Sequence, residues 1–189
     1  MKKIKILSLL FCVVMLVAAC HDDEEGPIIP QPREQVGRTV LVYIVGDNGV
    51  NELSDLFKTN FEDMKEGMKE VDYSKCNLVV YSEMVNDVPR LVSLKKQNGK
   101  VVADTLFTYS EQNPLAKEVM SSVISQTVSY FPADSYGFVF LSHSSSWVPA
   151  TNDANSRSIG YYRRTQMNIP DFHDVLLSSF PRPLKFILF

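Results

Sequence analysis

Apolar and β-branched residues form four short continuous runs along the chain. The runs cover residues 39–45, 77–81, 136–142 and 184–189. Continuous apolar runs of this length, bounded by turn-forming residues, are typical of strands that are buried on both faces of a parallel sheet. The pattern therefore predicts four strands that belong to one mainly parallel sheet.

Between these runs the apolar residues recur at helical spacing. Residues 51–71 are predicted to form an amphipathic helix. A second helix is expected to open at Asn113-Pro114, because asparagine caps helices well and proline fits the first helical position. A third, shorter helix is expected from Ile169 to about Ser179.

A hairpin signal interrupts the parallel pattern. Residues 90–94 and 101–108 flank Asn98-Gly99, which is the strongest short-range signal for a tight β-hairpin. A polar loop is expected over residues 144–164, before the last helix and strand. This alternation of strands and helices predicts an α/β fold with right-handed crossovers and a hairpin insertion.

The first residues have the order of a secretory signal peptide. Lys2, Lys3 and Lys5 precede an apolar run over residues 6–17, which is too short to span a bilayer comfortably. The segment that follows, Val-Ala-Ala-Cys20, resembles the bacterial lipobox, in which the cysteine thiol is acylated and becomes the new N-terminus. The alternative is an ordinary signal peptide that is cut after Ala19.

Residues 21–35 have the composition of a tether. An acidic run, His-Asp-Asp-Glu-Glu, is followed by three prolines in an apolar-poor stretch, which indicates an extended, solvated linker. The acidic run also resembles the surface-export signals of Bacteroidetes lipoproteins, although a simple spacer fits equally well. We therefore expect a signal peptide at 1–19, a lipidated tether at 20–36 and a domain at 37–189, anchored in the outer membrane and reaching the cell surface if the export signal holds.

Composition narrows the function classes. Without residues 1–19 the chain keeps 189 − 19 = 170 residues, and 19 − 3 = 16 basic against 22 acidic residues, which is a formal charge of −6. A nucleic-acid-binding surface needs clustered basic residues, so none is expected. With Cys12 in the signal peptide and Cys20 lipidated, only Cys76 remains, which excludes an internal disulfide and a cysteine zinc site.

Candidate chemistry lies where the predicted strands end, because open α/β sheets bind ligands at the carboxyl ends of their strands. Asp47 and Asn48 follow the first strand, Glu83 follows the second, and His143 follows the third. A histidine that closes a buried strand and opens a polar loop can act as a general base near neutral pH. If the last strand pairs with the third, its end would lie about 5 Å from the histidine strand.

Residues 142–147 read Ser-His-Ser-Ser-Ser-Trp and resemble the Ser-His-Gly-x-Gly-Trp motif of clostripain-like cysteine peptidases. That family shares a structural clan with caspases, gingipains and legumains. Residues 39–48, 130–136 and 185–189 resemble the family's opening strand, the lead-in to its histidine strand, and the strand that runs into Asp-Ala-Cys. The resemblance covers residues 38–189 and implies a caspase-like, mainly parallel sheet with flanking helices.

The resemblance also implies an activity. His143 would be the catalytic histidine, paired with a cysteine that attacks peptide bonds after arginine or lysine. That cysteine and the acid before it would follow Phe189, so the chain is expected to be an inactive fragment that a complementary C-terminal segment completes. The alternative is a non-catalytic surface lipoprotein that uses a degenerate peptidase scaffold for binding.

Further roles follow from the same resemblance. The backbone N–H of Ser144 would help to bind the oxyanion, although Ser144 and Ser146 replace the glycines of the motif. Asp47, Asn48 and Trp147 would shape the site, with helix capping as an equally good explanation of the first two.

Other candidates receive structural or processing roles. Family members mature by cleavage in the loop after the histidine, where Arg157, Arg163 and Arg164 lie, and Arg157 is the expected site. No metal or cofactor is expected; calcium is suggested by the family alone, and no Asp-x-Asp-x-Asp-Gly loop is present. Cys76 is expected to be an inert thiol at the amino end of the sheet, and His173 a surface residue.

Overall fold

The computed structural model describes residues 30–49, 51–144 and 158–189. The chain divides into two units, Met1–Pro30 and Gln31–Phe189, and the second unit carries the described fold. The predicted signal peptide, the lipidation site Cys20, the processing site Arg157 and the site-shaping Trp147 lie outside the described residues. Within the described part, no helix has both the length and the hydropathy needed to cross a membrane.

The second unit is built on a six-stranded sheet of order β4-β3-β2-β1-β5-β8. Strand β1 pairs in parallel with β2 and β5, β5 pairs in parallel with β8, and β3 and β4 are antiparallel. This confirms the predicted mainly parallel α/β fold with a hairpin insertion. The strands are β1 (Val36–Val45), β2 (Cys76–Glu83), β3 (Arg90–Gln97), β4 (Lys100–Thr108), β5 (Ala133–Ser142) and β8 (Phe186–Leu188).

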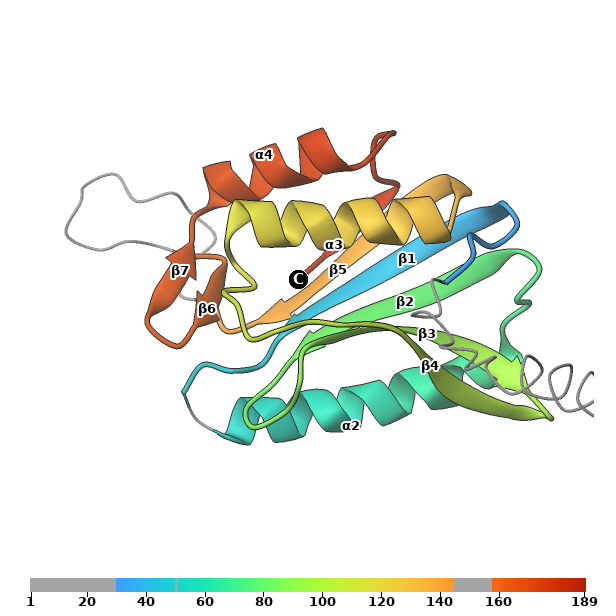
Figure 1. Cartoon of the computed structure of the whole chain (residues 1–189), viewed down its shortest axis with the longest axis horizontal. Coiled ribbons are helices and arrows are strands. Elements are labelled where there is room, and N and C mark those ends of the chain that lie inside the picture. Colours follow the sequence, from blue (N-terminus) through green and yellow to red (C-terminus); the bar gives the residue numbers. More distant parts are fainter. Residues whose placement is uncertain (1–29, 50, 145–157) are drawn as a thin grey trace, which may run out of the picture. The chain divides into compact units, whose positions relative to one another are not determined.

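Helices cover both faces of the sheet (Figure 1). Helix α2 (Asn51–Gly67), which continues into a 3-10 turn (Met68–Glu70), lies on one face, and α3 (Lys117–Tyr130) and α4 (Ile169–Ser179) lie on the other. The alternation of side chains along β1 supplies both cores. Leu41, Tyr43 and Val45 pack toward α3 and α4, whereas Val42 and Ile44 pack toward α2.

The residues just before β1 already belong to the domain. The backbone N–H of Arg33 donates to the Tyr130 carbonyl oxygen at 2.9 Å, and its guanidinium lies 4.8 Å from the centroid of the Phe131 ring. Strand β1 begins at Val36, so these contacts hold the residues immediately before the strand against the end of α3.

The prediction that Asn113-Pro114 opens a helix is wrong. The Asn113 side chain accepts the Leu115 N–H at 3.0 Å, and its backbone carbonyl accepts the Ala116 N–H at 3.1 Å. These bonds close a turn, which the Tyr43 hydroxyl holds by donating to the Pro114 carbonyl at 2.7 Å. The helix starts only at Lys117, whereas α4 begins where predicted because the Asn168 side chain accepts the Asp171 N–H.

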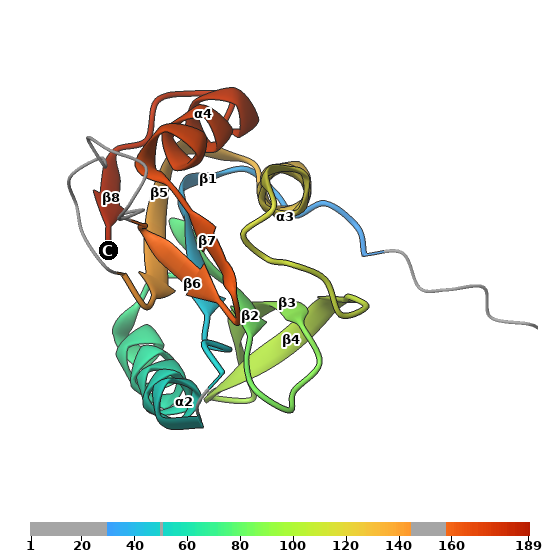
Figure 2. The same ribbon diagram turned by 90° about the vertical axis from the view of Figure 1, so that its left-hand side faces the viewer.

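The polar loop expected over residues 144–164 is partly wrong as well. Its end forms strand β6 (Gly160–Tyr162), which pairs with β7 (Thr165–Met167) in a separate two-stranded sheet. Two strands of three residues show too little alternation to be read from sequence, and the turn between them contains neither glycine nor asparagine. Figure 2 shows this hairpin in front of the carboxyl ends of β1 and β5.

Strand β8 lies beside β5, as the candidate site requires, but at the edge of the described sheet. The apolar run over 184–189 predicts a strand buried on both faces, but Ile187, Leu188 and Phe189 are 40–56% exposed because β8 has a neighbour on one side only in the described sheet. Its position beside β5 depends on Gly137, which pairs with Phe186. A Cβ at Gly137 would lie 2.3 Å from the Phe186 ring, so glycine is required for this packing.

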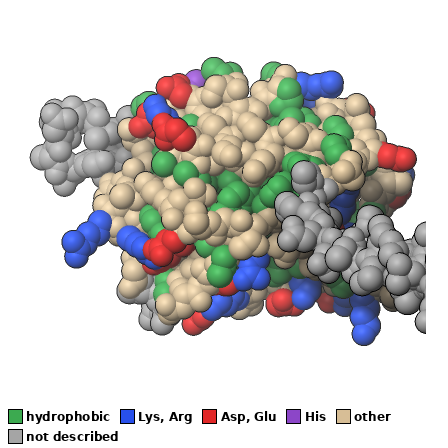
Figure 3. All heavy atoms as spheres, in the orientation of Figure 1, with side chains coloured by type: hydrophobic (Ala, Val, Ile, Leu, Met, Phe, Trp, Pro, Cys, Tyr) green, Lys and Arg blue, Asp and Glu red, His purple; other side chains and the backbone are tan. Residues whose placement is uncertain are grey.

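The sheet has one topological switch point, between β1 and β5. The chain leaves β1 for β2 on one side and returns to the other side of β1 as β5. In open α/β sheets the crevice outside the carboxyl ends of such strands is the usual place for a site. Acidic and basic side chains are interspersed on the face shown in Figure 3, so that face carries no patch of one charge.

Candidate active site

His143 stands at the carboxyl end of β5, next to the switch point. It directly follows Ser142, the last residue of the strand, and its side chain is exposed. The ring contacts Tyr161 of β6 edge-on, with 5.4 Å between ring centroids and 67° between ring planes. The imidazole is therefore reachable from solvent yet held on one side, which suits a general base.

The serines on either side of His143 join β5 to the hairpin. The Ser142 hydroxyl oxygen accepts the Tyr161 N–H at 3.2 Å, and the Ser144 hydroxyl donates to the Ser158 carbonyl at 3.0 Å. Among the described non-glycine residues, only Asn86, Asn98 and Arg163 have positive φ. The backbone at Ser144 thus does not need the glycine that the family motif places there.

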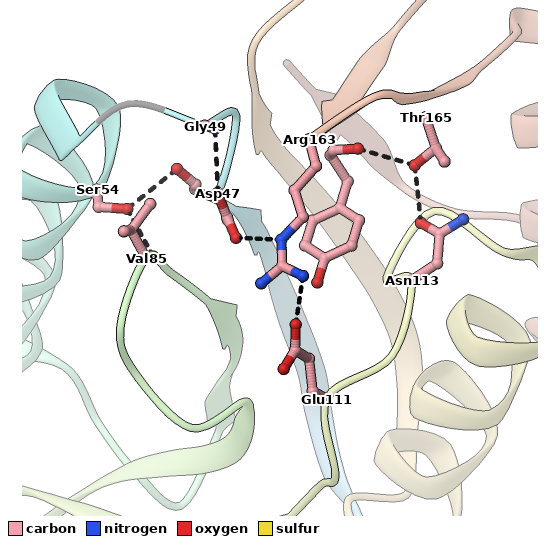
Figure 4. A network of polar contacts seen from close by, with 10 residues as sticks. Asp47, Gly49, Ser54, Val85, Glu111, Asn113, Arg163 and Thr165 are labelled. Carbon is pink, nitrogen blue, oxygen red and sulfur yellow. Dashed lines mark hydrogen bonds and ion pairs between the residues drawn. The ribbon is translucent and has the colours of Figure 1, made fainter.

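A network of polar contacts connects the end of β1 to the β6–β7 turn (Figure 4). Asp47 is only 6% exposed. One of its carboxylate oxygens accepts the Gly49 N–H at 3.1 Å, and the other binds Arg163 Nε at 2.7 Å. The Arg163 N–H also donates to the Asp47 carbonyl at 2.9 Å, and its guanidinium forms an ion pair with Glu111. Hydrogen bonds to Asp47 and Glu111 raise the pKa of Arg163, so its positive charge is constant.

Glu83, the last residue of β2, is a buried carboxyl group beside this network. It is 2% exposed, and Oε2 has no hydrogen-bond partner among the described residues. Burial, followed by the negative charge of Asp47, raises the pKa of Glu83 to about 7, while Arg163 acts in the opposite direction. Glu83 therefore titrates in the physiological range.

Ser54 of α2 ties the ends of β1 and β2 together. Its hydroxyl donates to the Gly46 carbonyl at 3.0 Å and accepts the Val85 N–H at 3.0 Å (Figure 4). The Gly46 N–H in turn donates to the Glu83 carbonyl at 2.7 Å. These bonds fix the backbone from which Asp47 and Glu83 project.

Cys76 lies at the opposite end of the sheet. It begins β2, level with Ser135 of β5 through their common neighbour Arg38. Ser135 is eight residues before His143, which is roughly 26 Å along a strand. Burial raises the pKa of the Cys76 thiol, which further lowers its reactivity. His173 is exposed on α4 beside Asp174.

The structure thus brings together four of the residues singled out from sequence, namely Asp47, Asn48, His143 and Ser144. It adds residues to which the sequence pattern gave no such role. The Arg163–Asp47 and Arg163–Glu111 contacts join residues more than 50 positions apart, and Tyr161 reaches His143 only through the pairing of β6 with β7. Asn48 is half-buried, and its N–H donates to the Gly46 carbonyl at 3.2 Å. Within the described ranges, no three His, Cys, Asp or Glu side chains are grouped as metal ligands.

A family model settles the affiliation of this site. The model of the clostripain family, Peptidase_C11, matches residues 42–189. The chain belongs to the clostripain family of cysteine peptidases. A search of curated proteins found no match.

Solved structures of clostripain-family proteins support the assignment. A secreted C11 cysteine protease from Bacteroides thetaiotaomicron, bound to an irreversible peptide inhibitor, is 39% identical, with a TM-score of 0.67 over 80% of this chain and 41% of its own. A B. fragilis cysteine protease is 41% identical, with a TM-score of 0.55 over 63% of this chain and 98% of its own.

A third clostripain-family structure is an inactive zymogen C11 protease from Parabacteroides distasonis. It is 34% identical, with a TM-score of 0.56 over 62% of this chain and 34% of its own. The present chain therefore spans about two fifths of the B. thetaiotaomicron protease and one third of the zymogen. The mainly parallel α/β architecture is the caspase-like fold of this family.

Proposed function

We propose that this chain carries the histidine part of a clostripain-like cysteine endopeptidase that cleaves after arginine or lysine. His143 would be the general base, and a cysteine on a segment following Phe189 would be the nucleophile. The supporting observation is the exposed imidazole of His143 at the carboxyl end of β5, with β8 as the next strand in parallel register. Cys76 does not fit the role of nucleophile, because it lies at the other end of the sheet.

The register of β5 and β8 gives the position of the proposed nucleophile. Val139 pairs with Leu188, and His143 is 143 − 139 = 4 residues further along β5. A continuation of β8 in the same register places the third residue after Phe189 opposite His143, about 5 Å away. In the family motif this strand runs into Asp-Ala-Cys, whose cysteine would take that third place.

This arrangement supports the following mechanism. His143 takes the proton of the cysteine thiol, and the thiolate attacks the peptide carbonyl carbon. The backbone N–H of Ser144 binds the negative charge that develops on the carbonyl oxygen. The His143 imidazolium then protonates the departing amine, and water hydrolyses the thioester with the imidazole again acting as base.

A non-catalytic binding module on the same scaffold is the second candidate. It draws on the replacement of the motif glycines by Ser144 and Ser146. At Ser144 the backbone has no positive φ and the hydroxyl has a hydrogen-bond partner, so the replacement at this position does not count against the endopeptidase. The endopeptidase is therefore the better-supported function.

We further propose export, lipidation of Cys20 and cleavage of the polar loop at Arg157. The basic, apolar and small-residue order of residues 1–20 supports the first two steps, and a family relative is described as secreted. Metabolic labelling with a fatty acid tests the anchor, since the wild type should take up label and Cys20→Ala should not. Label in both proteins would contradict lipidation at this residue.

The peptidase function is tested with the chain expressed together with the in-frame sequence that follows Phe189. We expect amide hydrolysis after arginine or lysine in a peptide substrate, and a loss of kcat/KM by a factor of at least about 10² in His143→Ala. His173→Ala is the matched control, because that histidine is exposed on α4. Activity that survives His143→Ala would refute the assignment.

A further inference from the structure

We propose that Arg163 is a positioning residue for His143. Held by Asp47 and Glu111, it fixes the β6–β7 hairpin so that Tyr161 packs against the imidazole. The catalytic meaning of this role rests on the proposed function of His143, whereas the structural coupling can be measured without activity.

The hairpin is attached to the sheet at both sides of the switch point. On the β5 side, the Tyr161 N–H donates to the Ser142 hydroxyl oxygen at 3.2 Å. On the β1 side, Arg163 donates to Asp47 through both its backbone N–H, at 2.9 Å, and Nε, at 2.7 Å. Tyr161 and Arg163 are only two residues apart, so a displacement of one attachment moves the other.

The backbone of Arg163 shows that its position is imposed by its contacts. Its φ is +52°, in the left-handed region that glycine, asparagine and aspartate tolerate better than arginine does. Such outliers persist where surrounding contacts over-determine the conformation, and they concentrate at functional sites. Here the contacts are the Asp47 carboxylate, the Asp47 carbonyl and the Glu111 carboxylate (Figure 4).

Asp47 in turn depends on Arg163. Its side chain is 8% exposed and lies near the buried Glu83, so loss of the guanidinium would leave negative charge at the end of β1 with reduced compensation. Arg163 is half exposed, which allows its side chain to be changed without opening the core. The anchor can therefore be removed at the surface and its effect read at the histidine.

The contact between Tyr161 and His143 transmits the hairpin position to the imidazole. The two rings meet edge to face at 5.4 Å, a geometry that favours one orientation of the histidine ring. Behind Tyr161, Gly160 is seated on the core, and a Cβ there would lie 2.9 Å from Leu115 and Phe140 side-chain carbons. Gly160 therefore packs closely on the core, next to the residue that contacts the imidazole.

The test uses NMR of the full chain with labelled histidine, and the His143 signals are assigned by their loss in His143→Ala. In Arg163→Ala we expect the His143 ring signals to move toward those of a solvated imidazole, as they should in Tyr161→Leu. Arg163→Lys should recover part of the shift. Arg164→Ala is the matched control, since its neighbouring side chain is also exposed, and His173 should not move in any variant.

Each outcome bears on the proposal. A His143 signal that moves in Tyr161→Leu but stays in place in Arg163→Ala would overturn it, and so would equal shifts in Arg163→Ala and Arg164→Ala. In the protein extended beyond Phe189, Arg163→Ala should lower kcat by about ten- to a hundredfold with little change in KM. If the NMR coupling is found but no peptidase activity exists in any variant, the proposed function fails while the positioning of His143 stands.

Discussion

The β3–β4 and β6–β7 hairpins both place the first turn residue at positive φ, but by opposite means. Between β3 and β4 the turn residues are Asn98, with φ of +51°, and Gly99, with φ of +78°. Both residue types tolerate the left-handed region, so this turn follows from local sequence. Between β6 and β7 the residue at φ +52° is Arg163, which is held there by contacts with residues 47 and 111.

The two hairpins also differ in where they lie relative to the candidate site. The β3–β4 turn projects away from the core, and a Cβ on Gly99 would meet no atom within 4 Å. The β6–β7 hairpin crosses the carboxyl ends of the strands, where the candidate site lies (Figure 2). A hairpin specified by distant contacts responds to changes in those contacts, whereas one specified by its own turn residues does not.

The largest effect on the free energy of unfolding is expected at Glu83, beside the β6–β7 hairpin. Folded Glu83 keeps its proton up to about pH 7, whereas the unfolded chain releases it near 4.5. The folded state binds more protons in this interval, so Glu83 makes the free energy of unfolding fall as pH rises from 4.5 through 7, by up to about 3 kcal/mol.

Glu83→Gln should remove this slope and make the variant more stable than the wild type above pH 7. Urea unfolding at pH 5 and pH 8 measures the difference. The exposed Glu70→Gln serves as control. Parallel pH curves for wild type and Glu83→Gln would show that the carboxyl group is ordinarily ionised in the folded protein.

The second largest effect is expected when one aspartate that contacts the β6–β7 hairpin, Asp47, is compared with one that belongs to the β3–β4 hairpin, Asp104. Asp47→Asn removes a buried, charge-assisted hydrogen bond and should lower the free energy of unfolding by about 2 kcal/mol. Asp104→Asn removes the exposed ion pairs with Lys95 and Arg33 at the 38% exposed β4 position and should cost less than about 1 kcal/mol. Equal costs in urea unfolding would mean that the β6–β7 hairpin depends on Asp47 no more than the β3–β4 hairpin depends on Asp104.

The glycines of the two hairpins are expected to give smaller effects that differ in their physical cause. Gly160→Ala should cost about 1–2 kcal/mol through overlap with Phe140 and Leu115, and Gly99→Ala a similar amount through its positive φ. Phe140→Leu should relieve part of the first cost in a double-mutant cycle, because the overlap with Leu115 remains, and leave the second unchanged. Additivity in both cycles would contradict the steric origin of the Gly160 effect.

The smallest expected effect concerns Ser144. Ser144→Gly restores the residue of the family motif and removes the hydrogen bond to the Ser158 carbonyl, which should cost about 0.5–1 kcal/mol. Ser74→Gly, at an exposed turn where the serine hydroxyl bonds to Asp72, is the control. A gain in stability at position 144 would show that serine there is a strained substitute.

The same contrast explains what could be predicted from sequence. The buried strands and the β3–β4 turn follow from local periodicity and turn chemistry, and so does the placement of His143 at a strand end. The turn at Asn113 is not predictable from sequence, because asparagine followed by proline suits a helix start as well as a turn. The turn is held by the hydrogen bond from the distant Tyr43 hydroxyl to the Pro114 carbonyl. The β6–β7 hairpin is not predictable from local sequence, because its turn residue Arg163 has positive φ and is held by contacts with the distant Asp47 and Glu111.

The packing of Phe186 on Gly137 has a consequence for spacing. Parallel pairing allows β8 to shift along β5 only in whole-residue steps of about 3.3 Å, and a one-residue step would turn every side chain to the other face. The Phe186 ring fits only over a residue without a Cβ, so the only permitted position of β8 is the one that places Phe186 over Gly137. The seating of Phe186 over Gly137 therefore fixes how far along β5 any group carried on β8 stands from the His143 imidazole. Changes in the length of the 181–185 connection would then be absorbed within that connection and would not shift β8 relative to His143.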